Sequence, residues 1–253
     1  MPTMEKEIRA ILFDLDGTLV DTEKLSVAAW YAIGEKYGYS IPPAFISRTR
    51  GQGADVGRQV AREELGEDFP YDRLAKEQMA RREEMVLEAE NLAMSGARAL
   101  LEELRARGML YTLVTSRQEE WGKNRLKRAH LDDLFGECIW RECVEKLKPD
   151  PEALFKGAEV LGVRPEECLM VGDTLSDVRA AAAAGMQCAF VKGTVEVSEE
   201  IARTAFLCDS VTDILKFLPE MEKEECSYRP RKKSIISKLR SVLMKRSRSK
   251  KGK

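Results

Sequence analysis

The stretch Ile11-Leu-Phe-Asp-Leu-Asp-Gly-Thr-Leu-Val20 decides the fold. The apolar run at 10–13 predicts a buried strand. Asp14 and Asp16 follow at its carboxyl end, where carboxylates cost free energy unless a cation or hydrogen bonds satisfy them. Mg²⁺ prefers oxygen ligands and usually takes only one or two protein carboxylates. The stretch therefore fits a Mg²⁺ site, or more simply a strand that ends in a turn at Gly17.

Length and composition indicate one large domain, or one domain that carries an insert. The chain has 253 residues, of which 43% are hydrophobic, which is enough for a packed core. No run of 18 apolar residues is present, so we expect no transmembrane segment. The six cysteines show no paired metal spacing, and we interpret them as reduced thiols of a cytoplasmic protein.

Charge is distributed unevenly along the chain. The net charge is −1, but residues 229–253 hold 12 Lys or Arg and no Asp or Glu. Without those 12, the 42 basic residues fall to 30, against 43 acidic residues in the rest of the chain. An acidic body therefore precedes a strongly basic tail.

The first third of the chain carries helical patterns after its opening strand. Apolar residues recur at helical spacing through 21–37, and two further helical patterns span 54–65 and 71–89. Residues 38–53 are broken by several glycines and prolines, so we expect loops there. No strand pattern occurs between 22 and 93, which predicts an all-helical insert.

From about residue 94 the pattern changes to strands that alternate with helices. We predict strands at 109–115, 138–140, 168–172, 187–191 and 206–208, and helices at 97–107, 118–129, 151–161, 176–184 and 211–218. Such alternation predicts an α/β fold, a Rossmann-like parallel sheet core with helices on both faces. Ligands of these sheets bind beyond the carboxyl ends of the strands.

Polar residues gather at that edge of the predicted sheet. Thr115 and Ser116 follow the second strand, Lys148 precedes a helix, and Asp173 and Asp177 follow the fourth strand. Each has an ordinary structural explanation, because hydroxyls and carboxylates cap helices and most lysines are exposed. One site shared with the two carboxylates of the first strand explains them better than four separate coincidences.

These motifs resemble those of the haloacid-dehalogenase superfamily of phosphotransferases, in the subgroup with a helical cap inserted after the first strand. The resemblance rests, in order, on Phe-Asp-Leu-Asp-Gly-Thr at 13–18, Leu-Val-Thr-Ser at 113–116, Lys-Pro-Asp-Pro at 148–151 and Val-Gly-Asp-Thr-Leu-Ser-Asp at 171–177. It covers roughly residues 8–218 and is specific for fold and chemistry, but weakly specific for the substrate.

The resemblance implies a role for each matched residue. Asp14 would be the nucleophile that forms an aspartyl-phosphate, and Asp16 would protonate the leaving oxygen and then deprotonate water. Mg²⁺ would be held by Asp14, the backbone carbonyl of Asp16 and Asp173. Lys148 would hold the charge of Asp14 and of the phosphoryl group, while Asp177 would orient Lys148 or metal-bound water.

Other matched groups would bind the substrate. The Thr115 hydroxyl and the backbone N–H groups of Leu15 and Ser116 would bind phosphoryl oxygens. Because dehalogenases place a non-acid where Asp16 stands, the resemblance implies a phosphate ester with an oxygen leaving group. The expected enzyme is thus a phosphomonoesterase that acts on a small phosphorylated metabolite, of the phosphoglycolate or sugar phosphate type.

A β-phosphoglucomutase-like phosphomutase is the alternative within the same family. Such mutases usually carry a histidine near position 26 and an arginine just after the cap glycine. This chain has Ser26 and Ala54 at those places, and its only histidine, His130, is far from every motif. These departures weaken the mutase interpretation and leave it open.

The insert at 22–93 would form the cap, and the core would comprise 1–21 and 94–218. The cap should close over the site and select the substrate. Three cap arginines, Arg48, Arg50 and Arg58, flank a Gly-Gln-Gly turn, and one of them could anchor an acidic substrate. A solvated basic loop is the plainer interpretation.

The tail at 219–253 extends beyond the family pattern. Ile235, Leu239, Val242 and Leu243 fall on one face of a helix with basic residues around it, typical of a helix on an anionic membrane surface. Nonspecific nucleic acid binding and a disordered tail are the alternatives. A protein of another class, a non-catalytic binding protein that uses this tail, would have no need of four costly charges at Asp14, Asp16, Lys148 and Asp173.

Overall fold

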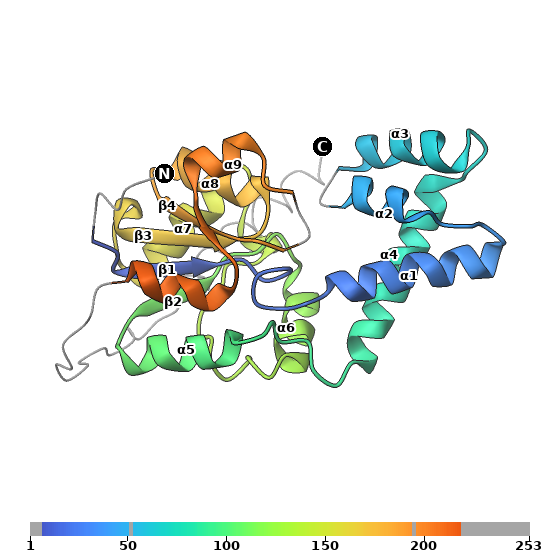
Figure 1. Ribbon diagram of the computed structural model, residues 1–253. Helices are drawn as coiled ribbons and strands as arrows, with labels where there is room; N and C mark the ends of the chain where they lie inside the picture. The colour runs from blue at the N-terminus through green and yellow to red at the C-terminus, as the bar shows by residue number, and fades with distance from the viewer. Residues whose placement is uncertain (1–6, 51–52, 194–195, 219–253) are drawn as a thin grey trace, which may run out of the picture.

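The computed structural model describes residues 7–50, 53–193 and 196–218. Its centre is a parallel five-stranded sheet in the order β2-β1-β3-β4-β5 (Figure 1). The strands are β1 (Ala10–Phe13), β2 (Leu110–Leu113), β3 (Cys168–Gly172), β4 (Gln187–Val191) and β5 (Phe206–Cys208). The predicted α/β fold with a parallel sheet is confirmed.

Strand β1 lies between β2 and β3 and is buried along its whole length. Phe13, its last residue, pairs with Leu113 on one side and Val171 on the other. This register brings the carboxyl ends of three strands to one edge, so residues that follow them in the sequence meet there. The apolar strand β1 is thus buried inside the sheet, while the polar residues that follow the strands face a cavity at the edge of the sheet.

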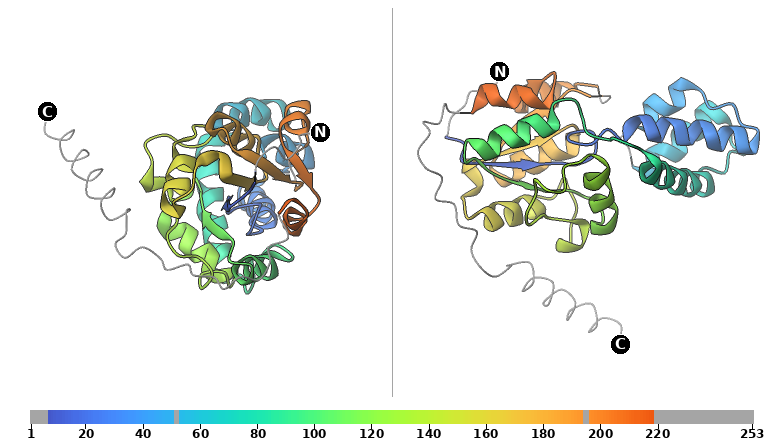
Figure 2. Two further views of the ribbon diagram at one scale, coloured as in Figure 1. Left: turned by 90° about the vertical axis from the view of Figure 1, so that its left-hand side faces the viewer. Right: turned by 90° about the horizontal axis from the view of Figure 1, so that it is seen from below.

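Helices cover both faces of the sheet (Figures 1 and 2). One face carries α5 (Ala97–Ala106) and the 3₁₀ segment η3 (Val211–Phe217), which pack on each other. The other carries α7 (Glu152–Leu161) and α8 (Leu175–Ala184). The remaining elements of this part are α6 (Glu119–Arg128), α9 (Glu199–Thr204), η1 (Arg141–Cys143) and η2 (Pro165–Glu167).

Four helices lie to one side of the sheet, between β1 and α5 in the sequence (Figure 1). They are α1 (Glu23–Tyr37), α2 (Pro43–Thr49), α3 (Ala54–Leu65) and α4 (Tyr71–Glu88). Their buried side chains form a hydrophobic cluster separate from that of the sheet. The Trp30 ring packs edge-on against Phe45, with 4.9 Å between centroids, at the centre of this second cluster.

Helix α4 connects the two hydrophobic clusters. Leu74, near its start, is buried among the cap residues, whereas Val86, near its end, is buried in the core of the sheet. Its middle, at Arg82 and Glu83, faces helix α6 and the cavity described below. Helix α4 therefore contributes side chains to both hydrophobic clusters.

Some local predictions were wrong. Helix α2 occupies part of the segment expected to be loop, because Pro43 stands in its first turn, where the missing N–H group costs nothing. Helix α9, which Ser198 caps by accepting a hydrogen bond from the Ile201 N–H, was not predicted. The predicted strand 138–140 makes only a single bridge, between Val114 and Ile139.

The predicted helix 211–218 is a 3₁₀ segment, η3. Its capping box of Ser210 and Asp213 fixes the start, as in an α-helix, but the turns are tighter. In the ranges described, no helix is long and apolar enough to cross a membrane. The basic tail, with the membrane, nucleic acid and disorder interpretations attached to it, lies outside the described residues.

Candidate active site

A cavity of about 380 Å³ opens at the carboxyl edge of the sheet, between the core and the cap helices. Every segment predicted to contribute to a site reaches it: the ends of β1, β2 and β3, and the loop before α7. Its ionisable lining consists of Asp14, Asp16, Glu23, Asp173 and Asp177 and, among basic residues, Arg50, Arg82, Arg117 and Lys148. Both charge signs therefore face the same small volume.

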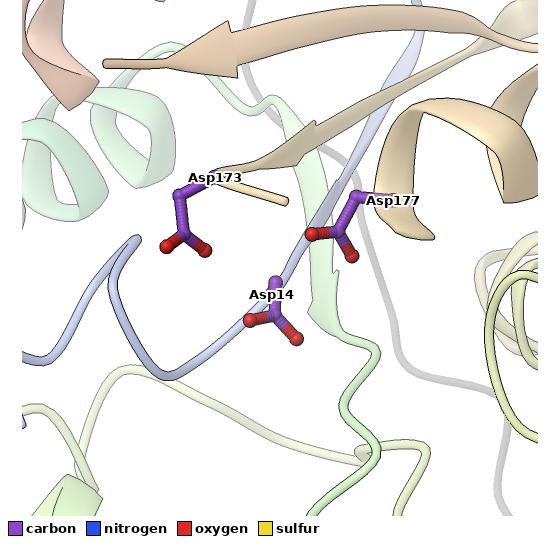
Figure 3. A group of neighbouring side chains, drawn as sticks. All are labelled: Asp14, Asp173 and Asp177. Carbon is purple, nitrogen blue, oxygen red and sulfur yellow. The ribbon is translucent and has the colours of Figure 1, made fainter. Parts of the chain in front are cut away.

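Three carboxylates meet on the core side of the cavity (Figure 3). Oxygen atoms of Asp14, Asp173 and Asp177 lie within 4.8 Å of one another. Asp14 follows β1, Asp173 follows β3, and Asp177 lies in the first turn of α8. All three are buried, with Asp14 and Asp173 each 8% exposed.

Lys148 is the cation that the cluster contains. Its Nζ donates to Asp14 Oδ1 at 2.6 Å, to Asp177 Oδ1 at 2.6 Å and to the Val114 carbonyl oxygen at 3.1 Å. The side chain is 5% exposed. Three acceptors match its three N–H bonds, so Lys148 is fixed in position and direction.

The pKa values report an unbalanced negative charge. Burial raises the pKa of Asp14 to about 6, although Lys148 opposes the effect. Burial, with Asp14 and Asp177 beside it, raises the pKa of Asp173 well above its ordinary value. Burial lowers the pKa of Lys148, but the two carboxylates that it contacts more than offset this, so its pKa lies above the ordinary value.

The donor set fits a divalent metal ion. Among the described residues of this cluster, one ammonium group faces three carboxylates, which leaves two negative charges to be balanced. Asp177 uses both oxygens, since Oδ1 accepts from Lys148 and Oδ2 accepts from the Thr174 N–H and hydroxyl groups. Asp14 and Asp173 are therefore the better candidates for metal ligands, and their role stays a prediction.

Gly17 keeps the space beside Asp173 open. A Cβ atom at this position would lie 2.1 Å from Asp173 Oδ2, and the backbone has a φ of +81°. Thr18, which follows, donates its hydroxyl to Asp173 Oδ1 at 3.3 Å. The glycine of the opening stretch is thus required both by its backbone and by the approach of this carboxylate.

Asp16 is turned away from the acidic cluster. Its Oδ1 accepts hydrogen bonds from the Thr22 hydroxyl at 2.8 Å and from Arg125 Nε at 2.8 Å, and its Oδ2 from Arg117 Nε at 2.9 Å. Burial raises the pKa of Asp16, but Arg117 and Arg125 lower it by more, so that the pKa falls from the ordinary 3.8 to about 2. Since its side chain is engaged in this way, only its backbone carbonyl is left for the predicted metal contact.

Arg125 joins this carboxylate to the cap. Its guanidinium donates two hydrogen bonds to Glu83 of α4, from Nη1 to Oε2 at 2.7 Å and from Nη2 to Oε1 at 2.6 Å. The Arg125 side chain is 0% exposed, although it stands on the strongly charged helix α6. Two carboxylates distant in the sequence, Asp16 and Glu83, supply the charge that such burial requires.

Arg82, beside Glu83 on α4, lines the same cavity. Its Nη2 lies 3.3 Å from Glu83 Oε1, while its Nε has no hydrogen-bond partner among the described residues. Burial, and then the positive charge of Arg117, lower the pKa of Arg82. This guanidinium is therefore largely removed from water and incompletely neutralised.

Of the predicted phosphate-binding residues, Thr115 and Ser116 line the cavity, whereas Leu15 does not. Thr115 is buried and its Oγ1 accepts from the Arg117 N–H at 3.1 Å, while the exposed Ser116 lies beside it on the cavity wall. Leu15 is fully buried between the two carboxylates, and its carbonyl accepts from the Leu19 and Val20 N–H groups. Leu15 stands in the chain between Asp14 and Asp16, which do line the cavity, and the roles of all three residues stay predictions.

A protein-family model matches most of this chain. The model of the haloacid dehalogenase-like hydrolases matches residues 11–191, which is more than half of the chain. The chain belongs to this family. The match runs from the opening strand to the end of β4 and so includes all four motifs and the inserted helices.

Relatives of this haloacid dehalogenase-like hydrolase carry phosphatase names. Phosphoglycolate phosphatase 1 of Pseudomonas aeruginosa is 30% identical over 215 residues, which cover 82% of this chain and 78% of that protein. Pyrophosphatase PpaX of Bacillus cereus is 26% identical and covers 86% and 99%. A β-phosphoglucomutase structure from Clostridium difficile aligns with a TM-score of 0.62 at 20% identity, covering 94% and 99%, and shows the fold.

The three arginines predicted from the sequence as possible substrate anchors differ in their location and their ion pairs. Arg48 pairs with Glu63 and Glu64 outside the cavity, and Arg58 pairs with Asp55 and Asp72. Only Arg50 lines the cavity, where it is paired with Glu23. Arg48 and Arg58 are thus partly exposed, ion-paired residues of helices α2 and α3 and not parts of a solvated loop.

Sequence reasoning did not identify Arg82, Arg117 and Arg125. Arg117 directly follows Thr115-Ser116, a position that could have indicated it. Arg82 and Arg125 stand in helices rich in charged residues, where an arginine ordinarily faces solvent. No local pattern distinguishes them, because their partners come from other elements.

Proposed function

We propose that this hydrolase is a Mg²⁺-dependent phosphomonoesterase that acts on a small phosphorylated metabolite through an aspartyl-phosphate on Asp14. One observation carries the proposal. Asp14 lies at the end of the central strand, 2.6 Å from the buried Lys148, in an acidic cluster that fits a divalent ion and beside a cavity of about 380 Å³. The phosphatase names of the relatives agree with it.

Asp14 is suited to nucleophilic attack on phosphorus. Its Oδ1 is held by Lys148, so the carboxylate is fixed at the cavity wall before a substrate arrives. Attack by the carboxylate would break the ester bond and leave the phosphoryl group on Asp14. Mg²⁺, held by Asp14, Asp173 and the Asp16 carbonyl, would offset the repulsion between the carboxylate and the phosphate dianion.

Lys148 and its neighbours would receive the transferring group. The Lys148 ammonium, fixed by Asp177, supplies positive charge close to Asp14. The Thr115 hydroxyl and the N–H groups of Leu15 and Ser116 would donate to the phosphoryl oxygens. Because these donors belong to a rigid sheet edge, they need little rearrangement as charge develops.

Asp16 would move protons in both halves of the reaction. With two arginines beside it, the Asp16 carboxylate is ionised in the present arrangement, and these ion pairs lower its affinity for a proton. To protonate the leaving oxygen in the first half, Asp16 must first leave these ion pairs and take up a proton from solvent. In the second half the Asp16 carboxylate would take a proton from the water that hydrolyses the aspartyl-phosphate.

The chain would consist of a catalytic core and an inserted cap that covers it. We propose a core of residues 1–21 and 94–218 and a cap of residues 22–93, with the cavity between them. Support comes from the separate hydrophobic cluster of the cap helices and from Arg50 and Arg82, which reach the cavity from the cap side. The cap would thus contribute to substrate choice while the core holds the reacting groups.

The experiment is phosphate release from a panel of phosphomonoesters that includes phosphoglycolate, hexose phosphates, nucleotides and pyrophosphate, with Mg²⁺ or EDTA. Metal-dependent release by the wild-type chain, lost in Asp14→Asn, is the expected result. Asp132→Asn, an exposed aspartate of the core, is the matched control and should retain activity. Conversion of β-glucose 1-phosphate to the 6-phosphate without net release would favour the mutase, and no turnover at all would refute both.

A further inference from the structure

We propose that Arg82 binds a second anionic group of the substrate. This inference rests on the proposed function and narrows it: the preferred substrate is a phosphate monoester that carries a carboxylate or a second phosphate close to the ester. Three observations carry it, namely a surplus of positive charge, a guanidinium nitrogen without a partner, and the place of Arg82 in the lining of the cavity that Asp14 also lines.

Positive charge exceeds negative charge around Arg82. Within the described ranges, three guanidinium groups lie close enough to repel one another: those of Arg82, Arg117 and Arg125. They share two carboxylates, since Arg117 and Arg125 contact Asp16, and Arg82 and Arg125 contact Glu83. Arginine stays protonated in proteins, so one positive charge of this cluster is left over. A buried surplus charge is unfavourable unless a ligand neutralises it.

The surplus falls on Arg82 rather than on its neighbours. Arg125 uses Nε on Asp16 and both terminal nitrogens on Glu83, and Arg117 directs its Nε to Asp16. Arg82 has only the longer contact of 3.3 Å to Glu83, an oxygen that Arg125 already occupies at 2.6 Å. The Arg82 side chain is 16% exposed and its Nε lacks a partner in the described structure.

The remaining basic residues of the cavity have their own partners. Arg50 is paired with Glu23, and Lys148 is shared by Asp14 and Asp177. Among the described residues that line the cavity, Arg82 therefore carries the guanidinium that an incoming anion can neutralise without breaking an existing close ion pair. Its fork of N–H donors suits a carboxylate or phosphate, which can accept two bonds at once.

The positions of Asp14 and Arg82 determine where the two anionic groups of a substrate would bind. Asp14 and Lys148 lie on the core side of the cavity, and Arg82 comes from helix α4 of the cap. A substrate with its ester phosphate at Asp14 and a second anion at Arg82 would bridge core and cap. A neutral ester of equal size would leave the Arg82 charge unsatisfied, which disfavours its binding.

The test compares two matched pairs of substrates by kcat/KM. Phosphoglycolate is paired with 2-hydroxyethyl phosphate, in which a neutral hydroxymethyl group replaces the carboxylate. Glucose 1,6-bisphosphate is paired with glucose 1-phosphate. In the wild-type chain we expect at least one anionic member to be preferred about 10- to 100-fold, as for a charge-assisted hydrogen bond, and the pair that shows it identifies the anion as carboxylate or phosphate.

Arg82→Met should reduce that preference to about one, and Arg82→Lys should restore part of it. A ratio between two substrates is insensitive to partial unfolding, because loss of folded enzyme lowers both rates equally. Arg81→Met is the matched control: Arg81 is the preceding residue, its partners are Glu84 and Glu88, and it does not line the cavity. The preference should persist in this variant.

The outcomes separate this inference from the proposed function. An equal preference in wild-type and Arg82→Met enzymes would refute the role of Arg82 while leaving the phosphatase intact. Wild-type turnover of all four esters without preference would refute the second-anion subsite. Absence of Mg²⁺-dependent turnover of any ester by the wild-type chain would overturn the proposed function and this inference with it.

Discussion

Asparagine substitutions at Asp14 and Asp16 should change stability in opposite directions, although the two residues are only two apart. In metal-free protein at pH 7, Asp16→Asn should destabilise the fold. Asp14→Asn should leave the free energy of unfolding unchanged or increase it. The reason lies in their surroundings, since Asp16 faces two guanidinium groups and Asp14 faces other carboxylates.

The pKa values supply the magnitudes. The pKa of Asp16 falls from 3.8 to about 2, which corresponds to about 2 kcal/mol of stability at neutral pH. This contribution is present above pH 3.8 and disappears as the pH falls through about 2. The pKa of Asp14 rises from 3.8 to about 6, so its charge costs the folded state up to about 3 kcal/mol, a cost that disappears as the pH falls from 6 toward 3.8.

The assay is urea unfolding of both variants and the wild type in EDTA, at pH 7 and again at pH 4.5. At pH 7 we expect Asp16→Asn to lose about 2 kcal/mol, while Asp14→Asn gains up to about 3 kcal/mol, less whatever Lys148 loses with its partner. At pH 4.5 the gain of Asp14→Asn should shrink, whereas the loss of Asp16→Asn should remain. A marked destabilisation by Asp14→Asn in EDTA, or the same sign for both variants, would refute the electrostatic reasoning.

Three further predictions concern other parts of the molecule. Gly17→Ala should abolish phosphate release, because its Cβ would lie 2.1 Å from Asp173 Oδ2; retained activity would contradict the geometry. Phe45→Ala, at a fully buried position in the cap cluster, should lower the free energy of unfolding by about 3–5 kcal/mol in urea titrations, and a loss below about 1 kcal/mol would contradict the described packing. Burial raises the pKa of the Cys138 and Cys168 thiols to about 12, so in a Cys226→Ser variant the described cysteines should react with a disulfide reagent at pH 8 only after unfolding by urea; rapid labelling of native protein would refute this.

The fold could be predicted largely because its decisive signals are local. The strand at 10–13, the helix closed by Gly185 and the alternation after residue 94 each follow from hydrophobic period and capping residues close in sequence. Helix α2 was missed because Pro42 and Pro43 indicate a break as readily as a helix start. The predicted strand 138–140 failed because an apolar triplet does not specify how many pairs it makes.

The site divides in the same way. Asp14, Lys148, Asp173 and Asp177 were found together because each follows or precedes a regular element in a recognisable motif. Arg125 could not be predicted, because its burial is compensated by carboxylates that lie 42 and 109 positions away in the chain. Sequence patterns describe how often a residue type is exposed, whereas a buried ion pair depends on which distant residues meet.

Helix α4 has a mechanical consequence. Its 18 residues span about 27 Å, and its two ends are buried in different hydrophobic clusters. A rigid rod held at both ends transmits rotation: if the cap tilts, Arg82 and Glu83 must travel with the helix and cannot adjust one at a time. A tilt of helix α4 against the sheet would therefore change the distance between Glu83 and Arg125, and with it the ion pair that Arg125 makes with Asp16. The access of a substrate to the cavity and the ion pairing of Asp16, the proposed proton-transfer residue, would then depend on the same helix movement.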